Sequence, residues 1–243
     1  MSLIVSTVPY TIAGSPYEGR WIHEPSARAK PAVLMATDWM GIGESAIVMA
    51  KVIAGSDFSV FIADMYGASK RPRSMEDAIA LSDPLKKDFS QVRVRIAAAF
   101  ETMMQGPASG VRPIDSYGAV GFCFGGMNVL EFARSGADLK LFVSIHGDLI
   151  TTMPASRGAI KGELMVLHGA ADPVSPKEQR DAFEVEMEAA GVKWSMTTFG
   201  NAVHSFTDPS ASMPRVAEYD PFAAEWSLAI LDRALHRTLL GSG

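Results

Sequence analysis

Residues 117–134 read YGAVGFCFGGMNVLEFAR, and this stretch decides the fold that we predict. Its first part, Tyr117–Gly121, is a short apolar run typical of a buried strand, whereas Phe124–Arg134 has the pattern of a helix. Almost no loop separates the two. A strand that turns so directly into a helix is typical of a parallel sheet with helices packed on it.

Cys123 lies in that turn, between glycines at 121 and 125. A strand–turn–helix with this spacing carries the nucleophile of α/β-hydrolases, and glycine removes the side chains that would collide in so sharp a bend. The start of the helix also favours a thiolate over a thiol, because its free backbone N–H groups and the positive end of the helix dipole stabilise a negative charge. We therefore predict that Cys123 is a nucleophile. A buried structural cysteine is the alternative, which the glycine pattern alone does not exclude.

The rest of the chain alternates apolar runs with amphipathic stretches, as in repeated strand–helix units. We predict strands at Val33–Ala36, Phe58–Ala63, Leu139–His146, Glu163–His168 and Trp194–Phe199. We predict helices at Glu44–Ala54, Lys177–Ala190 and Pro221–Leu240, a helical stretch over Met75–Met104 that breaks near Ser82–Pro84, and an antiparallel hairpin at Val8–His23. The expected fold class is α/β: one domain over residues 1–243, with a mostly parallel central sheet and helices on both faces.

Composition excludes several classes of protein. The net charge of −5 argues against a nucleic-acid partner, which requires a basic surface. A single cysteine excludes an intramolecular disulfide. We find no signal peptide and no run near the roughly 20 apolar residues of a membrane span, so we expect no membrane partner and a cytoplasmic location.

Asp172 and His204 complete the predicted catalytic set. In α/β-hydrolases the chain order is nucleophile, then acid, then histidine, and these two residues follow Cys123 in that order. Each comes just after a predicted strand, at the edge where open α/β sheets bind ligands. We predict that His204 is the proton acceptor and donor, and that Asp172 orients its ring.

Each of these residues also has a simpler interpretation. Asp172 precedes a proline and fits an ordinary loop or capping residue, and His204 fits a polar loop residue. His146 and His168 end predicted strands, where we expect them to support the site or satisfy backbone groups. A metal site formed by His168, Asp172 and His204 has no supporting spacing, so we expect no metal.

Two backbone N–H groups should bind the oxyanion that forms during acyl transfer. One is expected from Phe124, which follows the nucleophile, and the other from Trp39, after an early strand. Asp38 precedes Trp39 and should lie near the thiol. There it either modulates the ionisation of the thiol or caps its loop, and the sequence favours neither role.

The sequence resembles the dienelactone hydrolase family over nearly its whole length. The resemblance rests on residues 36–41 (ATDWMG), 64–67 (DMYG), 121–126 (GFCFGG), 168–174 (HGAADPV) and 204–206 (HSF). It implies an α/β-hydrolase fold, a triad of Cys123, His204 and Asp172, and oxyanion donors at Trp39 and Phe124. It also implies no cofactor, a small-molecule substrate and a monomer.

Two departures from the family concern the substrate. The family enzyme that acts on dienelactone has glutamate, thought to relay a proton to the thiol, where this chain has Asp38. That enzyme also binds the carboxylate of its substrate with an arginine after the catalytic histidine, where this chain has Asp208. A second arginine of that clamp corresponds to Arg71 or Arg73. An acid does not replace a bidentate arginine, so a neutral ester or lactone is as plausible as dienelactone.

Aromatic residues near these motifs, including Tyr66 and Phe206, are candidates to line an apolar substrate pocket, with plain core packing as the alternative. The predicted function is hydrolysis of small esters or lactones through an acyl-thioester intermediate. The alternatives are a catalytically weak binding or regulatory member of the same fold and a redox-sensing thiol protein, although the chain has no second cysteine to resolve an oxidised Cys123.

Overall fold

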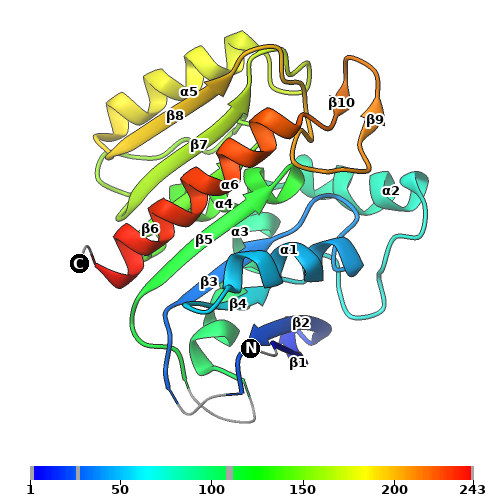
Figure 1. Cartoon of the computed structure of the whole chain (residues 1–243), viewed down its shortest axis with the longest axis vertical. Helices are drawn as coiled ribbons and strands as arrows, with labels where there is room; N and C mark the ends of the chain where they lie inside the picture. The colour runs from blue at the N-terminus through cyan, green and yellow to red at the C-terminus, as the bar shows by residue number, and fades with distance from the viewer. Residues whose placement is uncertain (1–2, 26–27, 108–111, 242–243) are drawn as a thin grey trace.

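The computed structural model describes residues 3–25, 28–107 and 112–241 and contains an eight-stranded central sheet (Figure 1). The strand order is β1-β2-β4-β3-β5-β6-β7-β8. The strands are β1 (Ile4–Ile12), β2 (Ser15–His23), β3 (Ala32–Ala36), β4 (Ser59–Ile62), β5 (Tyr117–Phe122), β6 (Leu141–Ile145), β7 (Glu163–Gly169) and β8 (Trp194–Phe199). From β4 to β8 the neighbours are parallel, whereas β1 and β2 form an antiparallel hairpin that joins the sheet through β4. The prediction of a mostly parallel sheet is confirmed, and the predicted hairpin is longer than expected.

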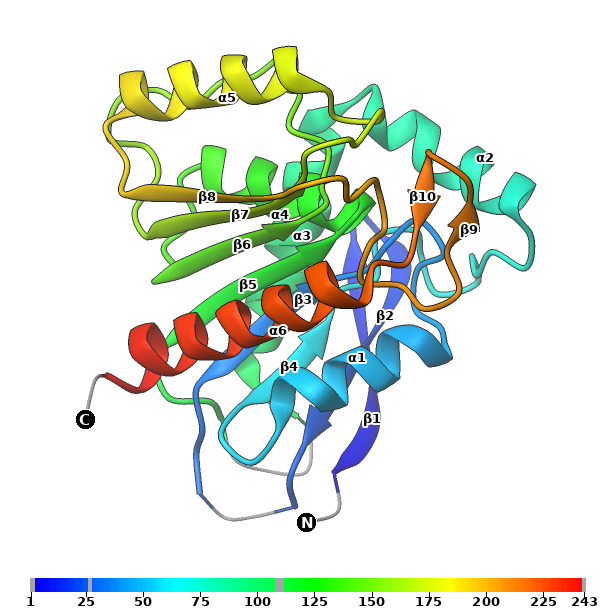
Figure 2. The same cartoon turned by 45° about the horizontal axis from the view of Figure 1, so that its top comes forward.

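Helices cover both faces of the sheet, as predicted (Figure 2). One face packs against α1 (Glu44–Ala54) and α6 (Pro221–Leu235). The other packs against α3 (Phe89–Gln105), α4 (Phe124–Arg134) and α5 (Lys177–Ala190). Strand β3 shows why both faces must be covered. Val33 and Met35 belong to the core under α1 and α6, whereas Leu34 and Ala36 belong to the core under α3, α4 and α5. All four side chains are buried. Alternate side chains of a strand point to opposite faces, so a run without polar residues fits only between two layers.

The predicted break in the helical stretch Met75–Met104 is present, but it lies after Lys86 and not near Ser82–Pro84. Helix α2 (Met75–Lys86) contains Pro84 in its last turn, and the chain breaks only at Lys87 and Asp88. The side chain of Asp88 accepts a hydrogen bond from the N–H of Gln91 and so begins α3. A capping side chain sets the boundary here, because a proline near the end of a helix costs one backbone hydrogen bond and leaves the following turn intact.

Two smaller features were not predicted. The terminal helix ends at Leu235 and continues as a π-helical turn, His236–Leu240. Two short strands, β9 (Ser212–Met213) and β10 (Ala217–Glu218), form a hairpin after β8. Strands of two residues are too short to show an alternating pattern. No helix within the described ranges has the length and apolar character needed to cross a bilayer.

Candidate active site

The turn at Cys123 has the strained geometry that the two glycines predicted. Cys123 itself has a positive φ of 54° and is half-buried. A Cβ atom at Gly121 would lie 2.0 Å from the carbonyl oxygen of Gly125, and one at Gly125 would lie 2.1 Å from the carbonyl oxygen of Ala36. Only glycine fits where these backbones approach so closely. The turn therefore places the thiol directly between the end of β5 and the start of α4.

The structure brings Cys123, His204 and Asp172 together in one hydrogen-bonded chain. Nε2 of His204 lies 3.0 Å from Sγ of Cys123, and Nδ1 lies 2.8 Å from Oδ2 of Asp172. The other carboxylate oxygen, Oδ1, accepts the N–H groups of Val174 and Ser175 at 2.8 and 3.3 Å. His204 and Asp172 are both buried. An imidazole held between a thiol and a carboxylate can move a proton to or from the sulfur side.

The surroundings of His204 favour its charged form. Burial alone lowers the pKa of the imidazole, but the adjacent Cys123 and the carboxylate of Asp172 raise it to about 10. The charged form of this ring donates from both nitrogens. It can hold a negative charge on the sulfur and later supply a proton to a leaving group.

His146 is a second imidazole at the nucleophile, and its contact with Cys123 was not predicted. It has a positive φ of 39° at the end of β6 and is buried. Its Nδ1 accepts a hydrogen bond from the backbone N–H of Cys123 at 3.1 Å, and its Nε2 lies 2.7 Å from Oγ1 of Thr207. Burial and the charge of His204 hold the pKa of His146 well below its usual range. Its place directly after a central strand was the one sequence signal of this contact.

His168, the other histidine that ends a strand, satisfies a backbone group, as we expected. Its Nε2 lies 3.0 Å from the carbonyl oxygen of Ser175. The backbone N–H of Ser175 is one of the two that donate to Asp172. Within the described ranges, no group of three histidine, cysteine, aspartate or glutamate side chains is arranged to hold a metal ion.

The two predicted oxyanion donors, Trp39 and Phe124, are joined through Tyr66. The hydroxyl of Tyr66 donates to the carbonyl of Trp39 at 2.8 Å, and its ring stacks on that of Phe124 at 5.9 Å between centroids. Phe124 is the first residue of α4, where backbone N–H groups have no partner inside the helix. Tyr66 therefore braces the loop after β3 against the start of α4.

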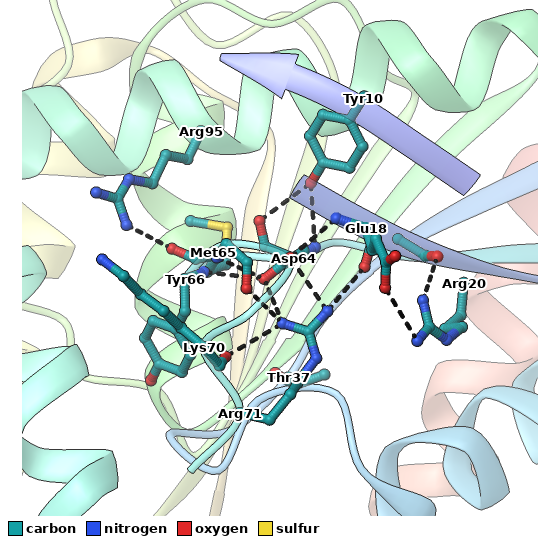
Figure 3. Close-up of polar contacts among 12 residues, drawn as sticks. Tyr10, Glu18, Arg20, Thr37, Asp64, Met65, Tyr66, Lys70, Arg71 and Arg95 are labelled. Carbon is teal, nitrogen blue, oxygen red and sulfur yellow. Dashed lines mark hydrogen bonds and ion pairs between the residues drawn. The ribbon is translucent and has the colours of Figure 1, made fainter. Parts of the chain in front are cut away.

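A buried cluster around Asp64 holds Tyr66 in place (Figure 3). Oδ1 of Asp64 accepts the N–H groups of Tyr66 and Gly67 at 3.0 and 2.9 Å. Oδ2 accepts the N–H of Glu18 at 3.0 Å, and Arg71 bonds both oxygens at 3.2 Å. The sequence showed residues 64–67 only as a family motif. The structure shows that Asp64 organises the loop after β4.

The structure does not bring Arg71 to the thiol as a substrate clamp. Besides Asp64, its guanidinium bonds the carbonyl oxygens of Gly67 and Glu18 at 2.7 and 3.2 Å. These contacts use the fork of donors that a substrate carboxylate would need. Arg73 is exposed, and neither arginine lines the cavity at Cys123.

Phe206 and Tyr66 are likewise core residues and do not line that cavity. Phe206 is fully buried, and its ring meets those of His146 and Phe199 at 4.9 and 5.5 Å between centroids. Phe206 therefore packs against the imidazole ring of His146. Core packing was the alternative interpretation of both aromatic residues, and it describes where they lie.

A cavity of about 550 Å³ opens above Cys123, between α1 and α6. Its walls are largely apolar: Val48 and Val52 come from one face of α1, and Leu228 comes from α6. His146 and Thr207 also line it. A larger hollow of about 950 Å³ lies at the opposite edge of the sheet, where β5 and β7 begin, and holds none of the triad residues. The smaller cavity is therefore the candidate substrate site.

The charged groups in this cavity are all acidic. Asp38, Glu44 and Asp208 line it, and none of the described lining residues is lysine or arginine. Asp38 is the carboxylate nearest the predicted oxyanion loop, and it accepts the N–H of Met40 at 2.8 Å. Burial raises the pKa of Asp38 to about 6; the Met40 hydrogen bond opposes this shift, and the charge of Asp208 adds to it. A negative field of this kind disfavours an anionic ligand.

Solved structures of other proteins share this architecture. Among solved structures, m3DLH is 30% identical with a TM-score of 0.87, covering 98% of this chain and 99% of its own. A dienelactone hydrolase-like promiscuous phosphotriesterase, P91, from metagenomic libraries is 29% identical with a TM-score of 0.88 and the same coverage. These similarities confirm the predicted α/β-hydrolase fold.

Curated proteins and a family model extend the comparison. An uncharacterized protein of Caenorhabditis elegans, K02A2.1, is 32% identical over 142 residues, which are 56% of this chain and 87% of the relative. The hydrolase pyvD of Aspergillus violaceofuscus is 23% identical over 186 residues, 76% of this chain and 73% of the relative. The model of the dienelactone hydrolase family matches residues 19–235. The chain therefore belongs to the dienelactone hydrolase family.

Proposed function

We propose that this protein hydrolyses small uncharged esters or lactones, with Cys123 as nucleophile, His204 as acid and base, and Asp172 as the group that orients His204. The observation that carries the proposal is the pair of contacts made by one imidazole, 3.0 Å to the sulfur and 2.8 Å to the carboxylate. Membership of a hydrolase family adds to it.

In the first half of the reaction the proton of the Cys123 thiol passes to Nε2 of His204. The thiolate sulfur attacks the carbonyl carbon, and the π electrons of the C=O bond move onto oxygen. The oxyanion then collapses, the bond to the leaving oxygen breaks, and that oxygen takes a proton from Nε2 of His204. Water attacks the resulting thioester as His204 accepts its proton. The second oxyanion collapses and the C–S bond breaks. The carboxylic acid leaves, and the sulfur takes back a proton from His204, which restores the thiol.

The backbone N–H groups of Trp39 and Phe124 are proposed to bind the oxyanion. Support comes from the position of Phe124 at the start of α4 and from the hydrogen bond by which Tyr66 braces the Trp39 loop. Donors fixed before the reaction stabilise the transition state without any reorganisation at the moment of charge development.

The charge of the cavity favours an uncharged substrate over an anionic one. Asp38, Glu44 and Asp208 would repel a substrate carboxylate. Arg71, a candidate for the predicted arginine clamp, is instead bound to Asp64. The apolar walls on α1 and α6 suit a hydrocarbon body.

The test uses three acetate esters of similar size: 3,3-dimethylbutyl acetate is uncharged, acetylcholine is cationic, and the acetate of a hydroxycarboxylic acid is anionic. We expect kcat/KM to be at least about tenfold higher for the uncharged ester than for the anionic one, since each like-charge contact is unfavourable. Asp208→Asn should narrow that gap, and Arg73→Ala, which removes an exposed charge away from the cavity, should leave it unchanged. A preference for the anionic ester would contradict the proposed substrate class.

The catalytic assignment has its own control. Cys123→Ser should keep the fold and lose at least about a hundredfold in kcat/KM, because a hydroxyl is a far weaker acid than a thiol. Rapid oxidation of Cys123 by peroxide in a protein that hydrolyses none of the esters would favour a redox-sensing thiol. Because P91 is a promiscuous phosphotriesterase, an uncharged phosphotriester belongs in the same panel.

A further inference from the structure

The hydrogen bonds of His146 fix which of its nitrogens carries the proton. The backbone N–H of Cys123 donates to the carbonyl oxygen of Ile145 at 3.0 Å and also faces Nδ1 of His146 at 3.1 Å. Because two N–H groups cannot face each other at that distance, Nδ1 is the acceptor in this shared hydrogen bond. The low pKa of this buried imidazole keeps it neutral, so its one proton lies on Nε2. Nε2 therefore donates to Oγ1 of Thr207 across 2.7 Å.

Thr207 receives this hydrogen bond on its hydroxyl oxygen. A hydroxyl has one hydrogen and can accept at its oxygen while donating elsewhere. Because the oxygen of Thr207 already accepts from His146, its hydrogen must go to another acceptor. Within the described ranges no acceptor for that hydrogen is found, although Thr207 is buried and lines the cavity above Cys123. A buried hydroxyl without an acceptor is costly, so a group that binds in the cavity is its natural partner.

The position of Thr207 indicates which atom of a bound ester this hydrogen meets. The proposed oxyanion donors, Trp39 and Phe124, come from the loop after β3 and the start of α4. His204, which must reach the leaving oxygen in order to protonate it, comes from the loop after β8, as does Thr207 three residues later. The ring of His146, which contacts Thr207 at 2.7 Å, lies 5.6 Å from the ring of His204 between centroids. We therefore infer that Thr207 lies on the leaving-group side.

We propose that the hydroxyl of Thr207 donates a hydrogen bond to the single-bonded oxygen of the substrate, the alkoxy oxygen of an ester or the ring oxygen of a lactone. His146 is the positioning residue that sets this direction, because it occupies the oxygen of Thr207 as an acceptor. The inference rests on the proposed function. No proton is transferred by Thr207: as the C–O bond breaks, the departing oxygen still takes its proton from His204.

The test compares an oxygen ester with its sulfur counterpart, benzyl acetate and S-benzyl thioacetate, because sulfur is a poor hydrogen-bond acceptor. Thr207→Val has nearly the same shape as threonine and lacks the hydroxyl. We expect it to lower kcat/KM about tenfold for benzyl acetate and about twofold or less for S-benzyl thioacetate. Thr207→Ser should restore both rates to within about threefold of the wild type, because serine keeps the donor. Thr102→Val, which removes a remote hydroxyl on α3, serves as the control and should change neither rate.

The role of His146 is tested by the same ratio of the two substrates. His146→Gln places an amide N–H where Nε2 lay, so Thr207 can still accept and the oxygen-to-sulfur ratio should stay within about threefold of the wild type. His146→Leu frees the oxygen of Thr207, and the ratio should fall about as far as in Thr207→Val. A merely structural role would lower both rates equally. Thermal unfolding shows which variants are folded, and Thr207→Val tests the proposal even if the histidine variants are not.

Equal losses for the two substrates in folded Thr207→Val, or no loss for either, would overturn the inference while leaving the triad untouched. A wild-type protein that hydrolyses neither substrate would instead contradict the proposed function, and the inference with it.

Discussion

Two buried aspartates lie at the same edge of the sheet and are held by the same local turn, but they have different partners. Asp64 follows β4, and Asp172 follows β7. In each, Oδ1 accepts the N–H groups of the second and third residues ahead, at 3.0 and 2.9 Å for Asp64 and at 2.8 and 3.3 Å for Asp172. The backbone thus fixes both carboxylates in the same way.

The two aspartates differ in the partners of their second carboxylate oxygen, Oδ2. For Asp64 it meets the guanidinium of Arg71 and the N–H of Glu18, and for Asp172 it meets the imidazole of His204. A guanidinium keeps its proton throughout the physiological range, whereas an imidazole gains and loses one. One turn therefore serves either as a fixed brace or as part of a proton-handling chain, according to the group that faces its second carboxylate oxygen.

The largest expected effect is on activity, in Asp172→Asn. The amide can still accept the two backbone N–H groups, but its NH₂ faces Nδ1 of His204 and favours the wrong tautomer. We expect kcat/KM for an uncharged ester to fall about 10³- to 10⁴-fold, as for similar triads, with a much smaller change in thermal stability. Steady-state kinetics and thermal unfolding measure both. An active Asp172→Asn enzyme would show that this carboxylate does not orient the base.

The same change at Asp64 should act mainly on stability. Asp64→Asn leaves Arg71, whose side chain is 26% exposed, without its counter-charge beside buried backbone. We expect the free energy of unfolding to fall by about 2–4 kcal/mol, in the range for breaking a buried pair, with a loss of activity below about tenfold. Chemical denaturation measures the first quantity. If Asp64→Asn instead removed activity without loss of stability, the distinction between the two aspartates would be wrong.

Asp38 follows β3 at the same edge of the sheet, but among the described residues no positively charged side chain forms an ion pair with it. Its Oδ1 accepts the N–H of Met40, and its pKa is raised to about 6, chiefly by burial. A carboxyl whose pKa is higher in the folded state holds its proton more tightly there, so folding stability falls as pH rises from about 4 to about 6. Asp38→Asn should remove this loss. We compare the free energy of unfolding of Asp38→Asn with that of wild type at each pH. Between pH 4 and pH 7 this difference should shift by about 1–2 kcal/mol in favour of Asp38→Asn.

Thermal unfolding of both proteins across this pH range is the measurement. If wild type and Asp38→Asn respond to pH in parallel, then Asp38 is not the group that titrates.

The smallest expected effect is that of Tyr66→Phe, which removes the hydrogen bond from the Asp64 cluster to the Trp39 loop. The aromatic stacking on Phe124 should remain. We expect kcat to fall about fivefold with KM little changed, since one neutral hydrogen bond is worth about 1 kcal/mol. A rise in KM at constant kcat would place the effect on substrate binding rather than on the oxyanion loop.

The fold and the close approach of Cys123, Asp172 and His204 could be predicted because their signals are local. Gly121, Cys123 and Gly125 lie within one turn, and Asp172 and His204 each follow an apolar strand. The parallel sheet brings these residues together, because the carboxyl ends of its strands lie at one edge. The helix boundary at Asp88 was missed because a capping aspartate is a weaker signal than a proline.

The second layer of the site could not be predicted, because its contacts join distant segments. Arg71 meets the carbonyl of Glu18, 53 residues away, and His146 meets Thr207, 61 residues away. The sequence shows that Arg71 and His146 lie near family motifs. It does not show which groups form hydrogen bonds with their side chains. The interpretation of Arg71 as a substrate clamp depended on a free guanidinium, and the contact with Asp64 removes that freedom.

The central claim is that Cys123 forms a covalent acyl intermediate with help from His204. The most direct test mixes the protein with excess of an uncharged aryl ester, quenches the reaction in acid within milliseconds, and locates the acyl group by peptide mass spectrometry. We expect one acyl group on the peptide that contains Cys123, slower acylation in Asp172→Asn and none in Cys123→Ala. An acyl group on another residue, or wild-type hydrolysis by Cys123→Ala, would contradict the account.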